Sequence, residues 1–273
     1  MYQLTEDNFM MKELLFVFYT IKKNIKNSAE LRTSFLMNIF GMAINNIAFV
    51  FLWVYFVKSV GIIGGWTTYD IIGLNGFAAL TYGIIFSVFM GIRKLPDYIS
   101  SGSFDRFMLS PKSIIMRVAT SAFSPSAVGD IIFGIICLSV YGFLIHISMI
   151  QIIFIILLIL FAAIIFFSLA TIIYSLGFYI TDTSEISDGA FQLFFTPTLF
   201  HGGAFQGVIR FIFTFVIPSL LIAAIPTETV KNISFGTLLM TGLLSFFWLF
   251  ISIKLFNHAV KKYESSNLMN FGQ

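Results

Sequence analysis

The feature that most constrains this chain is a run of 35 residues, Ile147 to Thr181, without a single Asp, Glu, Lys or Arg. As one helix the run would be about 52 Å long, which exceeds the roughly 30 Å hydrocarbon core of a bilayer. It is too short for two crossings and a turn, so we expect one crossing whose end enters the cytosol. The whole chain is 58% hydrophobic and 11% charged, whereas soluble domains carry about 25% charged residues. The sequence therefore predicts an integral membrane protein.

Other apolar runs predict further crossings, and the charges at the chain ends limit their number. The stretch 189–227 is broken by Pro and Gly and is long enough for two crossings. Lys254, Lys261 and Lys262 favour a cytoplasmic C-terminus, and with the N-terminus also inside the number of crossings must be even. We therefore predict six spans: residues 33–57, 71–92, 118–145, 150–176, 189–205 and 235–257.

Between spans five and six, residues 207–226 are predicted to enter the membrane from outside and return. Such irregular backbone is tolerated only where it is buried in protein or lines a wet cavity. The helix-breaking residues of this region are Pro197, Gly202, Gly203, Pro218 and Pro226.

Before the first span, residues 10–32 are predicted to form an amphipathic helix that lies on the membrane surface. Its apolar face holds Leu14, Phe18, Ile21 and Ile25, and its basic side holds Lys12, Lys23 and Lys26. The predicted fold class is thus an all-α integral membrane protein with six transmembrane helices, an N-terminal interfacial helix and an extracellular re-entrant segment, in one transmembrane domain over 1–273.

The polar stretch 93–117 sets the orientation. It carries five Lys or Arg against only Asp97 and Asp105, and short basic loops stay cytoplasmic. Lys58 and Lys231 are expected in outer loops. We therefore predict a multi-pass protein of the cell membrane with both termini in the cytoplasm.

Motifs for catalysis are absent from the sequence. It has no phosphate-binding loop of the form G-x-x-x-x-G-K-[ST], no H-E-x-x-H and no G-x-S-x-G. Cys137 is the only cysteine and the three His are scattered, so no disulfide, metal or enzyme site is predicted. A net charge of +3 gives no support for nucleic-acid binding.

Three polar residues are candidates for a gate inside the membrane. Asp130 lies within the third predicted span, where an unpaired Asp costs about 2.5–3.5 kcal/mol on insertion scales. It is either a gate or ion-pair residue, or it lies near the inner headgroups because Pro125 shortens the helix. Arg210, with His201 nearby, either forms a constriction at the outer mouth or extends to the headgroups from a short helix.

The order of these parts resembles the type-2 ABC transporter permease family, whose six-span subunits pair with a separate ATPase. The resemblance is carried by ISSGSFDRFMLSPKSI at 99–114 and LFHGGAFQGVIRFIFTFVIPSLLIAAIP at 199–226. The related subfamily often has Tyr-Pro early in the second segment, where this chain has Thr196-Pro197 and Phe200-His201. The match covers nearly the whole chain.

The resemblance implies that 93–117 is a cytoplasmic coupling loop that docks on nucleotide-binding ATPase subunits, and that ATP and Mg²⁺ are bound by that partner. The implied coupling residues are Phe104, Asp105, Arg106, Phe107, Leu109 and Pro111. Phe104, Phe107, Met108 and Leu109 would form the apolar side of the docking surface, unless they lie in the inner leaflet. The acidic stretch 182–188 is a second contact candidate.

Two alternatives to an exporter permease remain at this stage. One is an ATP-independent secondary transporter or channel, and the other is a membrane anchor or immunity protein. The second permease of the complex is either another copy or a different chain. Aromatic-rich spans favour a hydrophobic or amphipathic substrate, which the sequence does not identify.

Overall fold

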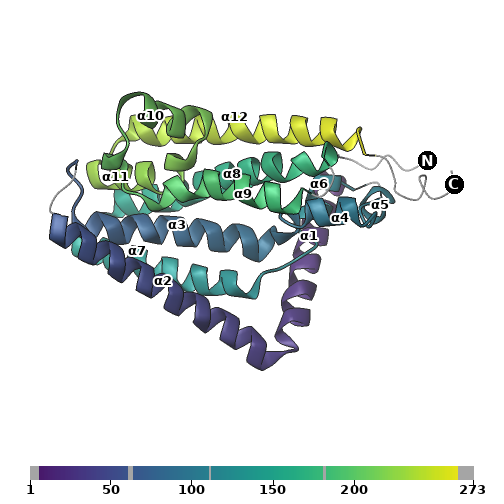
Figure 1. The fold of residues 1–273 in the computed structure, drawn as a ribbon, viewed down its shortest axis with the longest axis horizontal. Helices are drawn as coiled ribbons and strands as arrows, with labels where there is room; N and C mark the ends of the chain where they lie inside the picture. Colours follow the sequence, from purple (N-terminus) through teal and green to yellow (C-terminus); the bar gives the residue numbers. More distant parts are fainter. Residues whose placement is uncertain (1–5, 61–63, 111, 181–182, 264–273) are drawn as a thin grey trace.

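The computed structural model describes residues 6–60, 64–110, 112–180 and 183–263, and within these ranges the chain forms helices and no strand. Five of the described helices are long and apolar enough to cross a membrane, and they run side by side in Figure 1. They are α2 (Arg32–Val60), α3 (Thr68–Val88), α7 (Pro125–Leu144), α8 (Met149–Tyr174) and α12 (Phe235–Val260). A 3-10 turn, η2 (Ser175–Phe178), extends α8 into the end of the long uncharged run.

Helix α3 is the centre of the bundle and is the most buried of the five, whereas α2 lies at its outside. Small residues let the helices approach closely, as is usual between helices in membranes. A Cβ at Gly134 of α7 would lie 2.6 Å from Leu80 of α3. At Gly129 a Cβ would lie 2.5 Å from the carbonyl oxygen of Ile39 in α2. These two glycines therefore fix α7 between α3 and α2.

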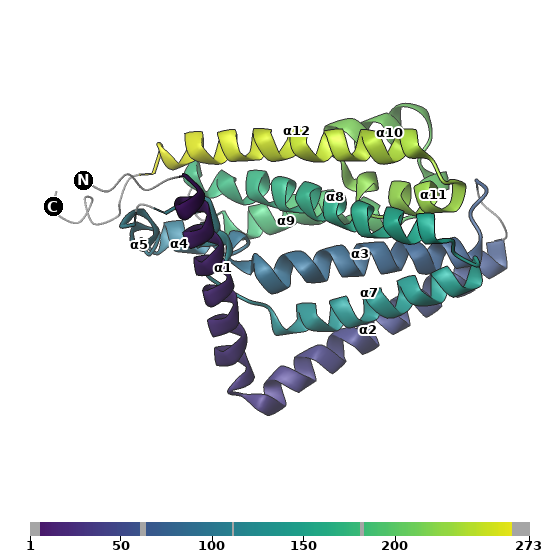
Figure 2. The same ribbon diagram turned by 180° about the vertical axis from the view of Figure 1, so that it is seen from behind.

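Helix α1 (Glu6–Ala29) runs at a steep angle to the bundle and crosses one of its ends (Figures 1 and 2). Phe18 and Ile25 of the predicted apolar face are exposed, so nothing in the described part of the chain covers them. The side chains of Lys12 and Leu14 lie outside the described residues. A helix therefore exists over most of the predicted residues, and its amphipathic character and its place on the membrane surface stay predictions.

The third apolar run begins later than its uncharged stretch suggests. A short helix, α6 (Ile114–Ala119), ends first, and α7 begins at Pro125 rather than at Val118. Ser124 adopts an extended conformation with φ −107° and ψ 114°, because a residue before proline is disfavoured in the helical region. Its N–H donates to the carbonyl oxygen of Phe86 over 3.2 Å. The predicted span 118–145 is thus shortened at its start.

The region between α8 and α12 is a series of short pieces. In order they are α9 (Ser184–Phe195), η3 (Thr196–Leu199), η4 (Gly202–Ala204), α10 (Gly207–Phe211), the π turn η5 (Ile212–Val216), η6 (Ser219–Leu221) and α11 (Ala224–Asn232). The predicted span 189–205 is therefore not one helix, since α9 has 12 residues and is about 18 Å long. The count of six crossings stays a prediction.

The stretch 219–225 within this region is the most deeply buried. Leu220, Leu221 and Ile222 are fully buried, and the hydroxyl of Ser219 donates to the carbonyl oxygen of Phe194 over 2.7 Å. By contrast, Val208 and other apolar side chains of α10 and η5 are exposed. The chain thus passes from the outside of the bundle into its core and returns through α11, as irregular backbone in a membrane protein must.

Candidate functional site: a loop at one end and an ion-paired segment at the other

The 93–117 loop folds around an aromatic core of its own. Its helices are α4 (Leu95–Ser100), α5 (Asp105–Met108) and the start of α6, and the 3-10 turn η1 (Met90–Ile92) joins them to α3. Phe104 is fully buried, with its ring centroid 5.1 Å from that of Phe178 and 4.8 Å from that of Tyr263. Tyr263 donates to Asp105 Oδ1 over 2.8 Å. Burial and this hydrogen bond raise the pKa of Tyr263 to about 12. These contacts fix the loop to the ends of α8 and α12.

Arginine side chains close the last turn of α5. Arg117 of α6 donates from Nη1 to the carbonyl oxygen of Phe107, and from Nη2 to that of Arg106 over 3.0 Å. The guanidinium of Arg106 lies 4.9 Å from the ring centroid of Tyr98, within the range of a cation–π contact. Basic side chains stabilise the unpaired carbonyl groups at a helix end. A helix of four residues is thereby held in one conformation.

The predicted docking surface needs a correction, because its two phenylalanines face inward. Phe104 is fully buried and Phe107 is only 5% exposed, whereas Leu109 is 86% and Met108 47% exposed. A loop of this length needs an internal core, and its largest apolar side chains supply it. The exposed members of the predicted docking surface are therefore Leu109, Met108 and Arg106. Pro111, also predicted to take part in coupling, lies outside the described residues.

The sequence did not reveal the ion pair that joins this loop to the rest of the bundle. Arg93 donates to Asp188 from Nε over 3.1 Å and from Nη2 over 3.0 Å. Tyr174, at the end of α8, donates to Asp188 Oδ1 over 2.6 Å. Burial raises the pKa of Asp188, but the hydrogen bonds from Arg93 and Tyr174 outweigh it and leave that pKa lowered. The ends of α3, α8 and α9 therefore meet at one carboxylate.

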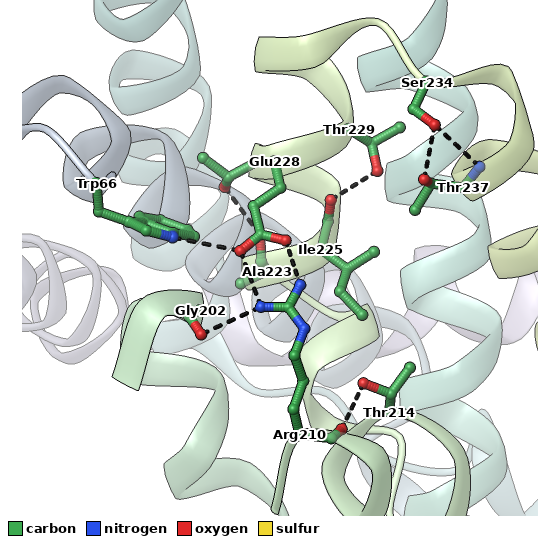
Figure 3. A network of polar contacts seen from close by, with 11 residues as sticks. Trp66, Gly202, Arg210, Thr214, Ala223, Ile225, Glu228, Thr229, Ser234 and Thr237 are labelled. Carbon is green, nitrogen blue, oxygen red and sulfur yellow. Dashed lines mark hydrogen bonds and ion pairs between the residues drawn. The ribbon is translucent and has the colours of Figure 1, made fainter. Parts of the chain in front are cut away.

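The opposite end of the bundle holds a second arginine–carboxylate pair (Figure 3). Arg210 of α10 forms an ion pair with Glu228 of α11, and its Nη1 also donates to the carbonyl oxygen of Gly202 over 3.3 Å. The indole N–H of Trp66 donates to Glu228 Oε1 over 3.3 Å. A Cβ on Gly202 would lie 2.3 Å from that same oxygen. Arg210 therefore has a partner within the protein, and Gly202 leaves the space for it.

Two more contacts fix α11. Lys231 lies 2.7 Å from Asp70 Oδ2 and donates to the carbonyl oxygen of Gly65 over 2.9 Å. Asp70 also forms a capping box with Thr67 at the start of α3. The side-chain amide of Gln151, at the start of α8, donates to the carbonyl oxygen of Val230 over 2.8 Å. Helix α11 is thus tied to α3, α8 and α10 at once.

The other residues predicted in the broken segment shape its backbone. Pro226 lies in the first turn of α11, where a missing N–H is tolerated. Pro197 and Pro218 lie at the starts of η3 and η6. At Gly203 the chain meets the 64–66 turn, since a Cβ at Gly64 would lie 2.7 Å from Gly203 Cα.

His201 lies near the ion-paired segment but does not join the pair. It is 5% exposed, with its ring centroid 6.1 Å from that of Trp66. Its Nδ1 has no hydrogen-bond partner in the described part of the chain. The structure thus brings His201 and Arg210 to the same end of the bundle and pairs only Arg210.

Asp130 lies away from both ion-paired ends of the bundle. It lies in the second turn of α7, is 2% exposed, and accepts a 2.6 Å hydrogen bond at Oδ1 from the side-chain amide of Asn46 in α2. This contact joins α2 to α7, and the Asp130 side chain is buried within the protein. Its depth in the membrane stays a prediction.

The partners of the predicted residues were harder to foresee than the residues themselves. Glu228, Asp188 and Asp70 are separated from their basic partners by 18, 95 and 161 residues, and Glu228 and Asp70 have no other acid close to them in sequence. A lone acid beside apolar sequence signals that a partner exists, because buried charges need one. It does not say which partner. No group of three or more His, Cys, Asp or Glu that could hold a metal occurs among the described residues.

Several long apolar helices around a buried, irregular segment define a multi-pass membrane protein. Residues 43–267 match the family model of the ABC-2 family transporter proteins, which covers most of the chain. The chain belongs to this family of ABC transporter membrane subunits, which confirms the resemblance seen in the sequence. A comparison with curated proteins finds no match.

Proposed function

We propose that the chain is the transmembrane half of an ATP-driven exporter of the cell membrane. It pairs with a second permease, either another copy or a different chain, and with separate ATPase subunits that bind ATP and Mg²⁺. The 93–117 loop contacts those subunits. Membership of the ABC-2 transporter family supports the permease role, and the export direction is proposed by analogy with the family.

The observation that carries this proposal is the contrast between Leu109 and the residues beneath it. Leu109 is 86% exposed, yet it follows a short helix, α5, that begins directly after the fully buried Phe104. An exposed leucine on a firmly held support is suited to a partner's pocket, because little order is lost on binding. Movement of the partner would then move the loop as a body rather than bend it.

A route from this loop into the membrane runs through two contacts with α9. The first is the Arg93–Asp188 pair. The second is a 2.5 Å hydrogen bond from the Ser184 hydroxyl to Asp97 Oδ1 of α4. A shift of α4 therefore displaces the start of α9, the helix that leads into the broken segment. ATP binding can drive transport only if it favours one arrangement of these contacts over another.

At the other end, we propose that α10, η5 and α11 form the re-entrant outer mouth. Arg210 and Glu228 border a cavity of about 560 Å³ between these elements and the start of α12. An ion pair beside a cavity can form a constriction that opens when its partners separate. This extends the sequence-based constriction hypothesis by naming Glu228 as the second half.

Co-purification tests the partner directly. The tagged chain should bring down an ATPase subunit, and Leu109→Asp should abolish this because a charge cannot enter an apolar pocket without cost. Leu109→Met is the matched control and should retain the partner. If the wild-type chain retains no ATPase, or if net transport persists without one, the proposal is wrong and an ATP-independent transporter or an anchor takes its place.

Orientation can be tested separately by thiol labelling in a Cys137→Ser background. Ser100 lies exposed at the end of α4, and Tyr69 is exposed at the opposite end of the bundle. Ser100→Cys should react with an impermeant reagent only from the cytoplasmic side, and Tyr69→Cys only from outside. Reaction of both from the same side contradicts the proposed topology.

A further inference from the structure

A cavity of about 270 Å³ opens between α2, α3, α7 and α9, away from both ion-paired ends. Its walls are partly aromatic, with Phe49, Phe133 and Phe195 among them. Between the rings lie polar side chains from all four helices. They are Asn45, Asn46, Asn75, Tyr82, Asp130 and Gln192. Apolar walls with a few converging polar groups are typical of sites for small ligands.

Asp130 is the charged residue of this cavity. It is 2% exposed, and its Oδ2 has no hydrogen-bond partner among the described residues, while Oδ1 is bound by Asn46. Among the described residues that line the cavity, none is Lys, Arg or His. A buried carboxylate is costly when one of its oxygens has no donor and no counter-charge lines its cavity. The carboxylate is thus suited to a ligand that brings a donor and a positive charge.

The amides around Asp130 add hydrogen-bond acceptors to the cavity. The Nδ2 of Asn46 already donates to Asp130, and that of Asn75 donates to the carbonyl oxygen of Ile71 over 2.8 Å. Each amide keeps its side-chain oxygen as an acceptor, together with one further N–H. A carboxylate with amide oxygens and aromatic faces matches an ammonium group, which has three donors and no acceptor and is attracted to ring faces.

The opening of the cavity indicates what the ammonium group is attached to. Asn45 and Gln192 are exposed while Asp130 is buried, so the mouth lies between α2 and α9 with Asp130 at the floor. Beside the mouth, Ile44 of α2 is 66% and Leu193 of α9 77% exposed. A ligand with its ammonium at Asp130 would therefore extend a chain past apolar side chains.

We propose that this cavity binds the primary ammonium group of an amphipathic amine, with its hydrocarbon chain directed out between α2 and α9. Asp130 accepts an N–H of the ammonium at Oδ2, and the amide oxygens accept the others. The site itself does not depend on the ATPase. The inference rests on the proposed function only in taking such an amine to be the exporter's cargo.

Equilibrium binding to the full chain in phosphatidylcholine nanodiscs tests the site. The probes are octylamine, octanol as its neutral counterpart, and octyltrimethylammonium as a cation without N–H donors. Each is measured beyond its uptake by empty nanodiscs. Octylamine should bind roughly tenfold or more tightly than the other two, as expected for hydrogen bonds to a charged group. Equal binding of octanol overturns the proposal, and equal binding of octyltrimethylammonium replaces it with a purely aromatic cage.

Two variants make the test specific. Asp130→Asn keeps the shape of the side chain and should lower octylamine affinity to that of octanol while leaving octanol unchanged. Gln192→Phe narrows the mouth at an exposed position that does not affect folding, and it should weaken octylamine to a similar degree. Unchanged octylamine binding in either folded variant contradicts the site.

A transport assay separates this inference from the proposed function. Vesicles that contain the chain and its ATPase should move octylamine only when ATP is present. Octylamine binding without ATP-driven movement supports the site and overturns its link to export. ATP-driven movement of another compound, without octylamine binding, leaves the exporter standing and overturns the site.

Discussion

The two ends of the bundle both contain ion pairs, but these pairs serve different purposes. Each has an arginine–carboxylate pair, Arg210–Glu228 at one and Arg93–Asp188 at the other. At the α11 end the neighbouring Lys231–Asp70 pair buries its carboxylate, whose side chain is 2% exposed, whereas that of Asp188 is 42% exposed. An enclosed carboxylate keeps its partner, since separation would strand a buried charge. A half-exposed one can release its partner to water at little cost.

The comparison teaches that the Lys231–Asp70 pair fastens α11 to α3, whereas the link between the 93–117 loop and α9 is adjustable. Helix α11 is held by three separate elements. The 93–117 loop is rigid within itself, because Phe104 is fully buried, yet one of its main links to α9 is a half-exposed pair. Motion should therefore occur at the contact between the loop and α9, the Arg93–Asp188 joint, and not inside the loop. The following predictions test this contrast, from the largest expected effect to the smallest.

Phe104→Ala should have the largest effect, because it empties the core of the loop. Loss of a fully buried Phe lowers the free energy of unfolding by about 3–5 kcal/mol. Unfolding in mixed detergent and denaturant, followed by far-UV circular dichroism, measures this loss of stability. Phe143→Ala, at a position 79% exposed, is the control and should change little. A small loss for Phe104→Ala would mean that the loop is not a rigid body.

Lys231→Met should rank second and should destabilise the α11 end. It leaves the buried Asp70 carboxylate without its counter-charge, at about 3 kcal/mol, the low end for a broken buried pair because the lysine is partly exposed. Lys254→Met, at an exposed position on α12, serves as the control in the same unfolding experiment. Equal effects of the two changes would remove the contrast between the ends.

Arg93→Gln should lower stability by only about 1 kcal/mol, since both side chains of its pair are partly exposed. Its functional effect should be larger, because the loop loses a main contact with α9. In the reconstituted complex we expect ATP hydrolysis to continue while transport falls. Arg93→Lys retains the charge without the bidentate geometry and should give an intermediate result. Parallel loss of hydrolysis and transport would place the joint elsewhere.

Acid should weaken the same joint. The pKa of Asp188 in the fold is lowered from 3.8, so its contribution to stability is complete above the unfolded pKa and is lost as pH falls below it. Because Asp188 is partly exposed, the loss should be less than about 1 kcal/mol. Unfolding measured from pH 6 to pH 3 should show it in the wild-type chain. Asp188→Asn should lack that component, and identical pH profiles for the two proteins would contradict the assignment.

Leu109→Ala should have the smallest effect on stability, within about 0.5 kcal/mol, as is usual for exposed sites. It should nevertheless weaken retention of the ATPase, because only the partner buries this side chain. Thermal unfolding and co-purification of the same preparation measure both effects. A marked loss of stability would show that Leu109 packs within its own chain.

Much of the bundle could be predicted, because long uncharged runs have few alternatives to a membrane helix. The fourth span and α8–η2 agree closely, spans 33–57 and 235–257 lie within α2 and α12, and span 71–92 covers most of α3 together with η1. The start of span 118–145 was predicted too early, although one interpretation of Asp130 already had Pro125 shorten that helix, as the restriction on Ser124 requires. The pieces of 184–232 follow from packing between distant segments, which periodicity does not encode.

The candidate site was predictable in its members more than in its contacts. Arg210, Asp130 and the 93–117 loop stand out by charge alone. Whether Phe104 faces a partner or its own core depends on Phe178 and Tyr263, which are distant in sequence. Local pattern identifies an apolar surface, and only the fold decides what covers it.

The position of α1 has a consequence for how the surrounding lipid acts on the protein. The side-chain amide of Asn24 donates to the carbonyl oxygen of Thr120 over 2.8 Å, and the Lys112 ammonium lies 4.1 Å from the ring centroid of Phe16. The helix predicted to lie on the membrane surface is thus fastened to the segment that an ATPase would contact under the proposed function. Bilayer thickness and lateral pressure should then slow or accelerate each transport cycle. A change in the labelling rate of Ser100→Cys between thin and thick bilayers would show that lipid acts on the loop.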